Sequence, residues 1–275
     1  MKYKLISSDY DRTLTNKEDK VPDENYDSII KFIDNGGIFC INTGREKPSI
    51  LSVYNNSPLR DYNMPLISHQ GALVFLPNED NRVLYKASLE IKDVVSITSY
   101  LDNLNCEYFI FTENNIIYNK MSKFLKFYIE ILKIKTSLIE VDSFSKYFLE
   151  NPDDTPMKIN LKSDLSELHG IIDKVNAKFK QKFTYIGYDM AELVASNASK
   201  GRALEEICKY YNISLDETVS IGDSANDISM LETAALGVVV DNAYDGVKEH
   251  ANIVIGDSSN ASVSKLIEDI INNRL

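Results

Sequence analysis

Short apolar runs alternate with amphipathic stretches over residues 1–72 of the 275-residue chain. Three of the runs are too short for helices and predict buried strands, at residues 3–7, 38–41 and 65–68. Between the first two, apolar side chains recur at helical spacing over residues 26–33, and Gly36-Gly37 is typical of a helix end. Strand, helix and strand joined by short connections predict a parallel sheet with right-handed crossovers.

The pattern changes over residues 73–190, where apolar runs flank Asn- and Asp-containing turns as in β-hairpins. Hairpins mixed with amphipathic helices predict an antiparallel α+β module. Parallel alternation resumes over residues 191–275, with a helix expected at Lys200–Tyr211 and a strand at 218–221. We therefore expect an α/β protein with a Rossmann-like, doubly wound core. That core would be formed by residues 1–72 and 191–275, with an α+β domain inserted over residues 73–190.

Charge and composition narrow the possible partners. Lys plus Arg number 30 and Asp plus Glu 41, giving a formal net charge of −11, which argues against nucleic-acid binding. Three scattered cysteines without a C-x-x-C spacing favour reduced thiols. The sequence shows neither the apolar core of a signal peptide nor an apolar run long enough to span a bilayer. We expect a soluble, cytoplasmic protein with no membrane partner.

Asp9 and Asp11 stand where the first predicted strand ends. If the strand stayed extended, these two carboxylates would lie on one side of it. Like charges this close repel each other unless a cation lies between them, and oxygen ligands suit Mg²⁺. Asp is also an ordinary turn residue, so both a metal site and a simple Asp-rich turn remain open from this stretch alone.

Other polar groups follow predicted strands or begin a predicted helix. Thr43-Gly44-Arg45 follows the second strand, residues 222–227 follow the strand at 218–221, and Lys200 begins a helix. In a doubly wound sheet, ligands gather at the carboxyl ends of the strands. Together these groups supply carboxylates for a metal, donors for anion oxygens and an ammonium. Such a set suits phosphoryl transfer, in which catalysis is mostly positioning and neutralisation of charge.

The order of these motifs resembles the haloacid dehalogenase (HAD) superfamily over the whole chain, in particular the Cof-type phosphatase branch with a large type IIB α/β cap. The four motifs are Asp9-Tyr10-Asp11-Arg12-Thr13-Leu14, Thr43-Gly44-Arg45, Lys200-Gly201-Arg202-Ala203-Leu204 and Gly222-Asp223-Ser224-Ala225-Asn226-Asp227. Residues 68–72 and 241–248 also look like that branch. The resemblance implies that the inserted domain is a cap.

The resemblance also implies catalytic roles. Asp9 would be the nucleophile that forms an aspartyl-phosphate. Asp11 would protonate the leaving alcohol and then activate water. Thr43 and Lys200 would bind the phosphoryl oxygens, and Lys200 would also neutralise Asp9.

Metal and substrate residues are implied in the same way. Asp9, Asp223 and the backbone carbonyl of Asp11 would hold Mg²⁺, while Asn226 and Asp227 would support the phosphate, the metal waters and Lys200. The expected metal residues are thus Asp9, Asp11, Asp223 and Asp227. The expected substrate-binding residues are Thr43, Gly44, Arg45, Lys200 and Asn226. Arg45 is equally compatible with an ion pair to a structural acid.

Two positions depart from the family pattern, because Arg12 stands where Gly is usual and Gln70 where Asn is usual. The function that the resemblance implies is a Mg²⁺-dependent phosphatase of small phosphorylated metabolites, sugar phosphates first. Two alternatives remain: a hexose phosphomutase, and a non-catalytic module that only accepts a phosphate on Asp9. The presence of Asp11 argues against the second, because turnover needs this residue more than phosphate acceptance does.

Overall fold

The structure is a computed structural model that describes residues 1–132, 136–179, 182–187 and 190–275. The chain forms two compact units. The first contains Met1–Gly44, Val53–Lys86 and Ser199–Leu275, and the second contains Arg45–Ser52 and Ala87–Ala198. In the described part of the chain, no helix has both the length and the apolar character needed to cross a membrane.

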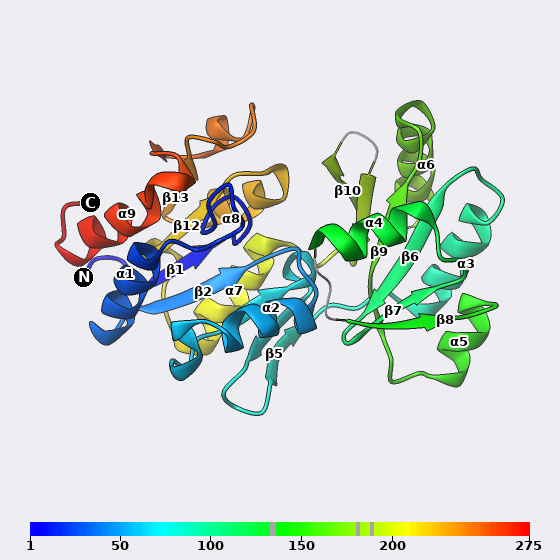
Figure 1. Cartoon of the computed structure of the whole chain (residues 1–275), viewed down its shortest axis with the longest axis horizontal. Coiled ribbons are helices and arrows are strands. Elements are labelled where there is room, and N and C mark those ends of the chain that lie inside the picture. The colour runs from blue at the N-terminus through cyan, green and yellow to red at the C-terminus, as the bar shows by residue number, and fades with distance from the viewer. Residues whose placement is uncertain (133–135, 180–181, 188–189) are drawn as a thin grey trace. The chain divides into compact units, whose positions relative to one another are not determined.

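A sheet that is mostly parallel forms the centre of the first unit (Figure 1). Its strands are β1 (Leu5–Ser8), β2 (Ile38–Asn42), β3 (Leu66–Ser68), β4 (Leu73–Leu76), β5 (Arg82–Lys86), β12 (Thr218–Gly222), β13 (Leu236–Val240) and β14 (Ile253–Ile255). The strand order is β14-β13-β12-β1-β2-β3-β4-β5. Pairing is parallel from β14 to β3 and antiparallel from β3 to β5. The central strand β1 therefore has β12 on one side and β2 on the other.

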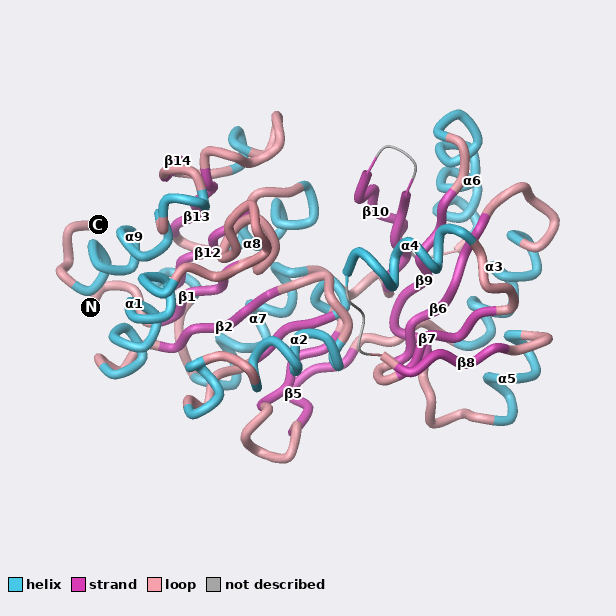
Figure 2. Tube along the Cα trace, viewed as in Figure 1, coloured by secondary structure: helices cyan, strands magenta, loops and turns pink. Residues whose placement is uncertain are grey.

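Figure 2 shows the helices of this unit beside its sheet. They are α1 (Asp23–Asp34), α7 (Lys200–Tyr211), α8 (Ile228–Thr233) and α9 (Ser262–Ile271), while α2 (Lys47–Asn55) begins in the second unit and ends in the first. Apolar side chains of α7 pack against the sheet, and α1 contacts α9. α7 packs Leu204 and Ile207 into a cluster with Leu5 and Cys40 of the sheet. This packing fixes the start of α7 at the carboxyl end of β1, where Lys200 contacts Asp9.

The second unit has its own mixed sheet. Its strands are β6 (Glu107–Thr112), β7 (Asn115–Tyr118), β8 (Ser137–Glu140), β9 (Pro156–Lys162), β10 (Lys182–Gly187) and β11 (Met190–Val194), in the order β10-β11-β9-β6-β7-β8. Neighbouring strands are antiparallel except β7 and β8. The helices are α3 (Ile91–Leu101), α4 (Lys123–Leu132), α5 (Phe144–Glu150) and α6 (Leu165–Lys178). Aromatic side chains of α4, Phe124 and Tyr128, pack on Phe109 and Phe111 of β6.

The expected α/β class and parallel core are confirmed, but the expected borders of the inserted domain are not those of the sheets. The hairpin β4-β5, expected in the insertion, extends the large sheet because β4 pairs with β3, with Leu66 opposite Phe75. Conversely, β11 reaches Val194 and pairs with β9 in the smaller sheet. A hairpin pattern shows that two strands pair, but not which sheet they join, so the two sheets divide at other residues than the sequence pattern indicated.

Candidate active site

Lys200 is the residue around which the site is built. It is the first residue of α7, whose N-cap Ser199 accepts a hydrogen bond from the backbone N–H of Arg202. The Lys200 side chain is 1% exposed, and its Nζ lies 2.5 Å from Asp9 Oδ1 and 2.6 Å from Asp227 Oδ1. Burial alone would lower the pKa of Lys200, but Asp227 and Asp9 outweigh burial and raise it. The ammonium is therefore charged.

Asp9 is buried directly after β1. Its backbone N–H donates to the carbonyl of Ile221 at 2.9 Å, which continues the pairing of β1 with β12 by one residue. Burial raises the pKa of Asp9 well above its usual range, Lys200 opposes this, and Asp227 and Asp223 add to it. The carboxylate therefore stays ionised most easily with a further cation beside it.

Asp227 is held on both of its oxygens. Oδ1 contacts Lys200, while Oδ2 accepts hydrogen bonds from the backbone N–H groups of Asp223 and Ser224, each at 2.9 Å. These contacts come from a capping arrangement in which Ser224 and Asp227 bracket the short 3-10 helix Ala225–Asp227. The Asp227 side chain is thus a fixed support for Lys200 and for the loop after β12.

Asp223 directly follows β12, and one of its two carboxylate oxygens has no hydrogen-bond partner among the described residues. Oδ1 accepts a hydrogen bond from the Thr13 hydroxyl at 3.4 Å, whereas Oδ2 is buried without a hydrogen-bond partner among the described residues. Arg12 Nε forms an ion pair with this Oδ2 at 3.4 Å. Burial, and then the Asp227 carboxylate, raises the pKa of Asp223 to about 6, although Arg12 opposes the rise.

The three carboxylates fit a divalent cation. One oxygen each from Asp9, Asp223 and Asp227 lies within 4.8 Å of the others. The buried carboxylates outnumber the one buried ammonium, and the buried Asp223 Oδ2 lacks a hydrogen-bond partner, its one contact with a cation being the half-exposed Arg12. Oxygen-only donors suit Mg²⁺. Among the described residues, the Asp11 carboxylate is not part of this set.

Gln70 connects three of the expected site residues, Thr43, Gly44 and Asn226. Thr43 is buried after β2, and its carbonyl accepts a hydrogen bond from the Gln70 backbone N–H at 3.3 Å. The Gln70 side-chain oxygen accepts from Asn226 Nδ2 at 2.8 Å. A Cβ at Gly44 would lie 2.3 Å from Gln70 Nε2, so a side chain at this position would displace the Gln70 amide. The sequence marked Gln70 only as a departure from the family pattern, whereas here it joins two of the expected motifs.

Arg45 is the one expected site residue that belongs to the second unit. That unit also contains a buried ion pair that the sequence did not suggest. Lys158 Nζ lies 2.7 Å from Glu192 Oε1, which also accepts from Asn160 Nδ2 at 3.0 Å. No sequence pattern marked this pair, because Lys and Glu side chains more often face solvent.

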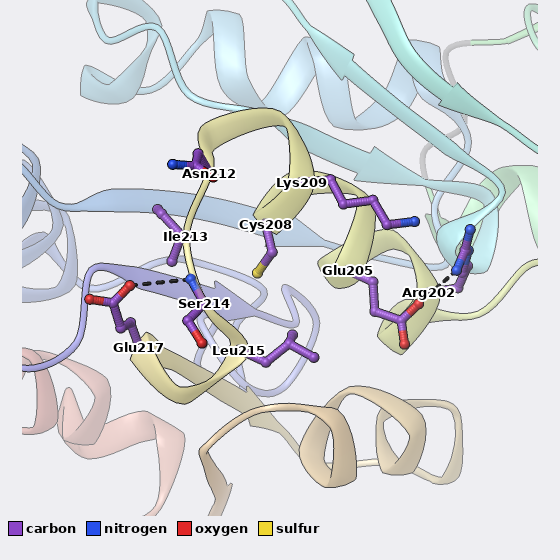
Figure 3. Close-up of a pocket in the computed structure, with 9 residues that line it drawn as sticks. All are labelled: Arg202, Glu205, Cys208, Lys209, Asn212, Ile213, Ser214, Leu215 and Glu217. Atoms are coloured by element: carbon purple, nitrogen blue, oxygen red, sulfur yellow. Dashed lines mark hydrogen bonds and ion pairs between the residues drawn. The ribbon is translucent and has the colours of Figure 1, made fainter.

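A surface pocket of about 620 Å³ lies elsewhere in the first unit (Figure 3). It is lined by Arg202, Glu205, Cys208, Lys209, Asn212, Ile213, Ser214, Leu215 and Glu217. None of the expected site residues lines it. Charged groups of the pocket pair with each other, as Arg202 does with Glu205 at 2.8 Å. The carboxylate site is therefore the better candidate for the active site.

A family model of haloacid dehalogenase-like hydrolases matches residues 6–267. The chain belongs to this family. The HAD hydrolase is 29% identical to phosphatase YwpJ of Bacillus subtilis, over 98% of this chain and 100% of the relative. It is 26% identical to the 5-amino-6-(5-phospho-D-ribitylamino)uracil phosphatase YitU of Bacillus subtilis, over 96% of both chains.

The fold of the HAD hydrolase is also that of solved members. It resembles the HAD subclass IIB sugar phosphatase BT4131 with a TM-score of 0.81 and 23% identity, over 97% of this chain and 98% of that one. The resemblance stated from the sequence motifs is confirmed, and the chain is a HAD-family phosphatase of the Cof type.

Proposed function

We propose that this phosphatase is Mg²⁺-dependent and hydrolyses small phosphomonoesters, sugar phosphates first, through an aspartyl-phosphate on Asp9. The observation that supports this most is the contact of one buried ammonium, Lys200 Nζ, with both Asp9 and Asp227. A cation in hydrogen-bond contact with the nucleophile can also neutralise the phosphoryl oxygens as the new bond forms.

Each step of the proposed reaction can be assigned to residues of this chain. An Asp9 oxygen attacks phosphorus while the bond from phosphorus to the alcohol oxygen breaks, and Asp11 gives its proton to that oxygen. In the second half, Asp11 takes a proton from water as the water oxygen attacks phosphorus and the Asp9 carboxylate leaves. Thr43 and Asn226 would hold phosphoryl oxygens, with Gly44 and Arg45 as further substrate contacts.

Asp9, Asp223 and the backbone carbonyl of Asp11 would hold Mg²⁺, which when bound supplies charge neutralisation at the phosphate. Asp223 Oδ2 supports this assignment because it is buried and lacks a hydrogen-bond donor. We assign Asp227 to the positioning of Lys200 rather than to metal ligation, since both of its oxygens are already engaged.

The substrate class rests on the relatives. The named substrate of YitU carries its phosphate on a ribityl chain, a sugar-alcohol ester, and BT4131 is named a sugar phosphatase. A polyhydroxylated alcohol is therefore the leaving group that we propose for this chain.

The test is a panel of phosphomonoesters with Mg²⁺, comparing the wild type with Asp9→Asn. We expect free phosphate from polyol and sugar phosphates, and none from the variant. Rapid acid quench should trap a phosphoprotein that hydroxylamine cleaves, as expected for an acyl phosphate. Full activity in excess chelator, or a phosphoprotein on Asp9→Asn, would contradict the proposal. An isomerised ester would favour the phosphomutase, and a persistent phosphoprotein without turnover would favour the acceptor module.

A further inference from the structure

Arg12 occupies a backbone conformation that favours glycine. Its φ is 62°, in the left-handed region, where a residue with a Cβ is strained. A strained residue of this kind persists where its surroundings hold it in place. The Arg12 side chain accordingly makes several contacts with its surroundings.

The guanidinium joins the loop after β1 to the loop after β13. Arg12 Nη1 donates to the Tyr244 hydroxyl at 2.7 Å, and Nη2 donates to the Asn242 carbonyl at 3.0 Å. The guanidinium carbon also lies 4.4 Å from the centre of the Tyr244 ring. In return, Asn242 Nδ2 donates to the Arg12 carbonyl at 2.8 Å. Three guanidinium contacts and one contact to the Arg12 backbone, all with Asn242 and Tyr244, thus fix the position of this positive charge.

Each of these two loops also contacts Asp223. The Tyr244 backbone N–H donates to the Asp223 carbonyl at 2.9 Å. Arg12 Nε lies 3.4 Å from Asp223 Oδ2, the buried oxygen that has no hydrogen-bond donor and that the proposed function offers to Mg²⁺. Arg12 and the metal would share one carboxylate oxygen, so the two cations would oppose each other.

We propose that Arg12 is a resident cation that competes with the divalent metal for Asp223 and thereby weakens metal binding. Metal occupancy would then follow the free Mg²⁺ concentration, whereas a glycine at this position would allow tighter binding. This inference rests on the metal site of the proposed function. Arg12 acts through Asp223 and is a positioning residue, not a catalytic one.

The size of the effect follows from Coulomb's law. Two cations that share one carboxylate oxygen repel each other, and water weakens this repulsion because the Arg12 side chain is 48% exposed. Removing the charge should therefore tighten metal binding about tenfold. Salt screens such a term, so the gain should shrink at about 0.5 M salt.

Calorimetric titration of the metal-free full chain with Mg²⁺, and with Mn²⁺ as a second probe, tests this without substrate. Arg12→Asn removes the charge and tolerates the left-handed conformation; Arg12→Gly is a second variant with no backbone strain. We expect both to lower the metal Kd about tenfold and Arg12→Lys to remain near the wild type. The matched control is Arg82→Asn, because Arg82 pairs with Glu79 at 3.2 Å and faces the Tyr210 ring at 5.6 Å. Its metal Kd should not change.

A metal Kd that is unchanged or higher in both neutral variants overturns the proposed role of Arg12. So does a gain that salt does not reduce, or an Arg12→Lys Kd equal to that of Arg12→Asn. A neutral variant that changes only the KM for an ester, with the metal Kd unchanged, makes Arg12 a substrate-binding residue instead. If neither the wild type nor any Arg12 variant binds metal, the proposed metal site fails, and this inference with it.

Discussion

Lys200 Nζ lies 2.6 Å from Asp227 Oδ1, and both side chains are almost completely buried. Asp227 is anchored in turn by two backbone N–H groups of its own loop. The ammonium is thus held by a carboxylate other than the proposed nucleophile, Asp9. Lys200 can neutralise Asp9 without relying on Asp9 for its position.

This arrangement predicts a strong coupling between the two residues. Lys200→Met leaves three buried carboxylates without their ammonium and should destabilise the metal-free protein by about 3–5 kcal/mol. Adding Asp227→Asn should restore part of this loss, because one of the unpaired charges is removed. Urea unfolding of the two single variants and the double variant measures the coupling. Lys209→Met is the control, since Lys209 is an exposed lysine of the same helix that pairs with Glu206; additive effects of Lys200→Met and Asp227→Asn would contradict the coupling.

Asp11 is expected to act as the acid in the first step. Help of this kind is typically worth about 10²–10⁴-fold for a poor leaving group, whereas p-nitrophenolate leaves well without a proton. Asp11→Asn should therefore slow the burst of alcohol release from a sugar phosphate far more than the burst from p-nitrophenyl phosphate. Release of phosphate from the common intermediate should slow equally for both. Glu18→Gln, at an exposed acid of the following turn, is the control; an equal slowing of both bursts by Asp11→Asn would remove the acid role.

The pKa of Asp223, raised to about 6, predicts opposite effects of pH on the metal-free and metal-bound protein. Because the folded pKa exceeds the unfolded one, this group contributes stability below about pH 4, and the contribution is lost as pH rises through about 6. Metal binding needs the ionised form, so it is favoured above that range. The rise in Tm on adding Mg²⁺ should be full at about pH 7.5 and should fade below about pH 6.

Melting curves with and without Mg²⁺ across this pH range provide the measurement. Asp223→Asn should lose the Mg²⁺ response at every pH and should flatten the pH dependence of the metal-free protein. A Mg²⁺ response that is the same at both ends of the range would show that these carboxylates do not hold the metal.

Gly71 is expected to tolerate no side chain. Its φ is +87°, and a Cβ there would lie 2.1 Å from the Ser199 carbonyl oxygen and 2.8 Å from the Lys200 backbone nitrogen. Gly71→Ala should therefore displace the start of α7 and reduce both stability and activity. Gly246→Ala separates the two causes, because Gly246 has the same φ of +87° with nothing within 4 Å. A stability loss for Gly246→Ala equal to that for Gly71→Ala would mean that the backbone conformation, and not the contact with α7, is decisive.

The sequence predicted which residues form the site better than it predicted what each of them contacts. Asp9, Lys200, Asp223 and Asp227 were expected together because parallel strands end at one edge of the sheet, and the structure brings them together. The sequence could not show that both Asp227 oxygens are engaged, which separates this residue from Asp223. That distinction depends on the direction of two backbone N–H groups, which has no signature in residue type.

The sequence could not predict the borders between the two sheets or the contacts of Arg12 and Gln70, because each depends on pairing between separate parts of the chain. β4 joins the large sheet through its pairing with β3, a choice between two possible partners that a local pattern cannot express. Arg12 and Gln70 were visible only as unusual residues. Their partners, Tyr244 for Arg12 and Asn226 for Gln70, lie far away in the chain.

The pairing of β1 with β12 has a consequence for biosynthesis. Leu5 lies opposite Thr218, and a ribosome that adds about 5–20 residues per second needs roughly 10–40 s to make the chain between them. During that time β1 can pair with β2 but exposes its other edge, a template for association with other chains. Ala87–Ala198 of the second unit is synthesised while that edge is still uncovered. Asp9, the proposed nucleophile, therefore stands at the end of a strand that completes its pairing late, and chaperone demand should be greatest in that interval.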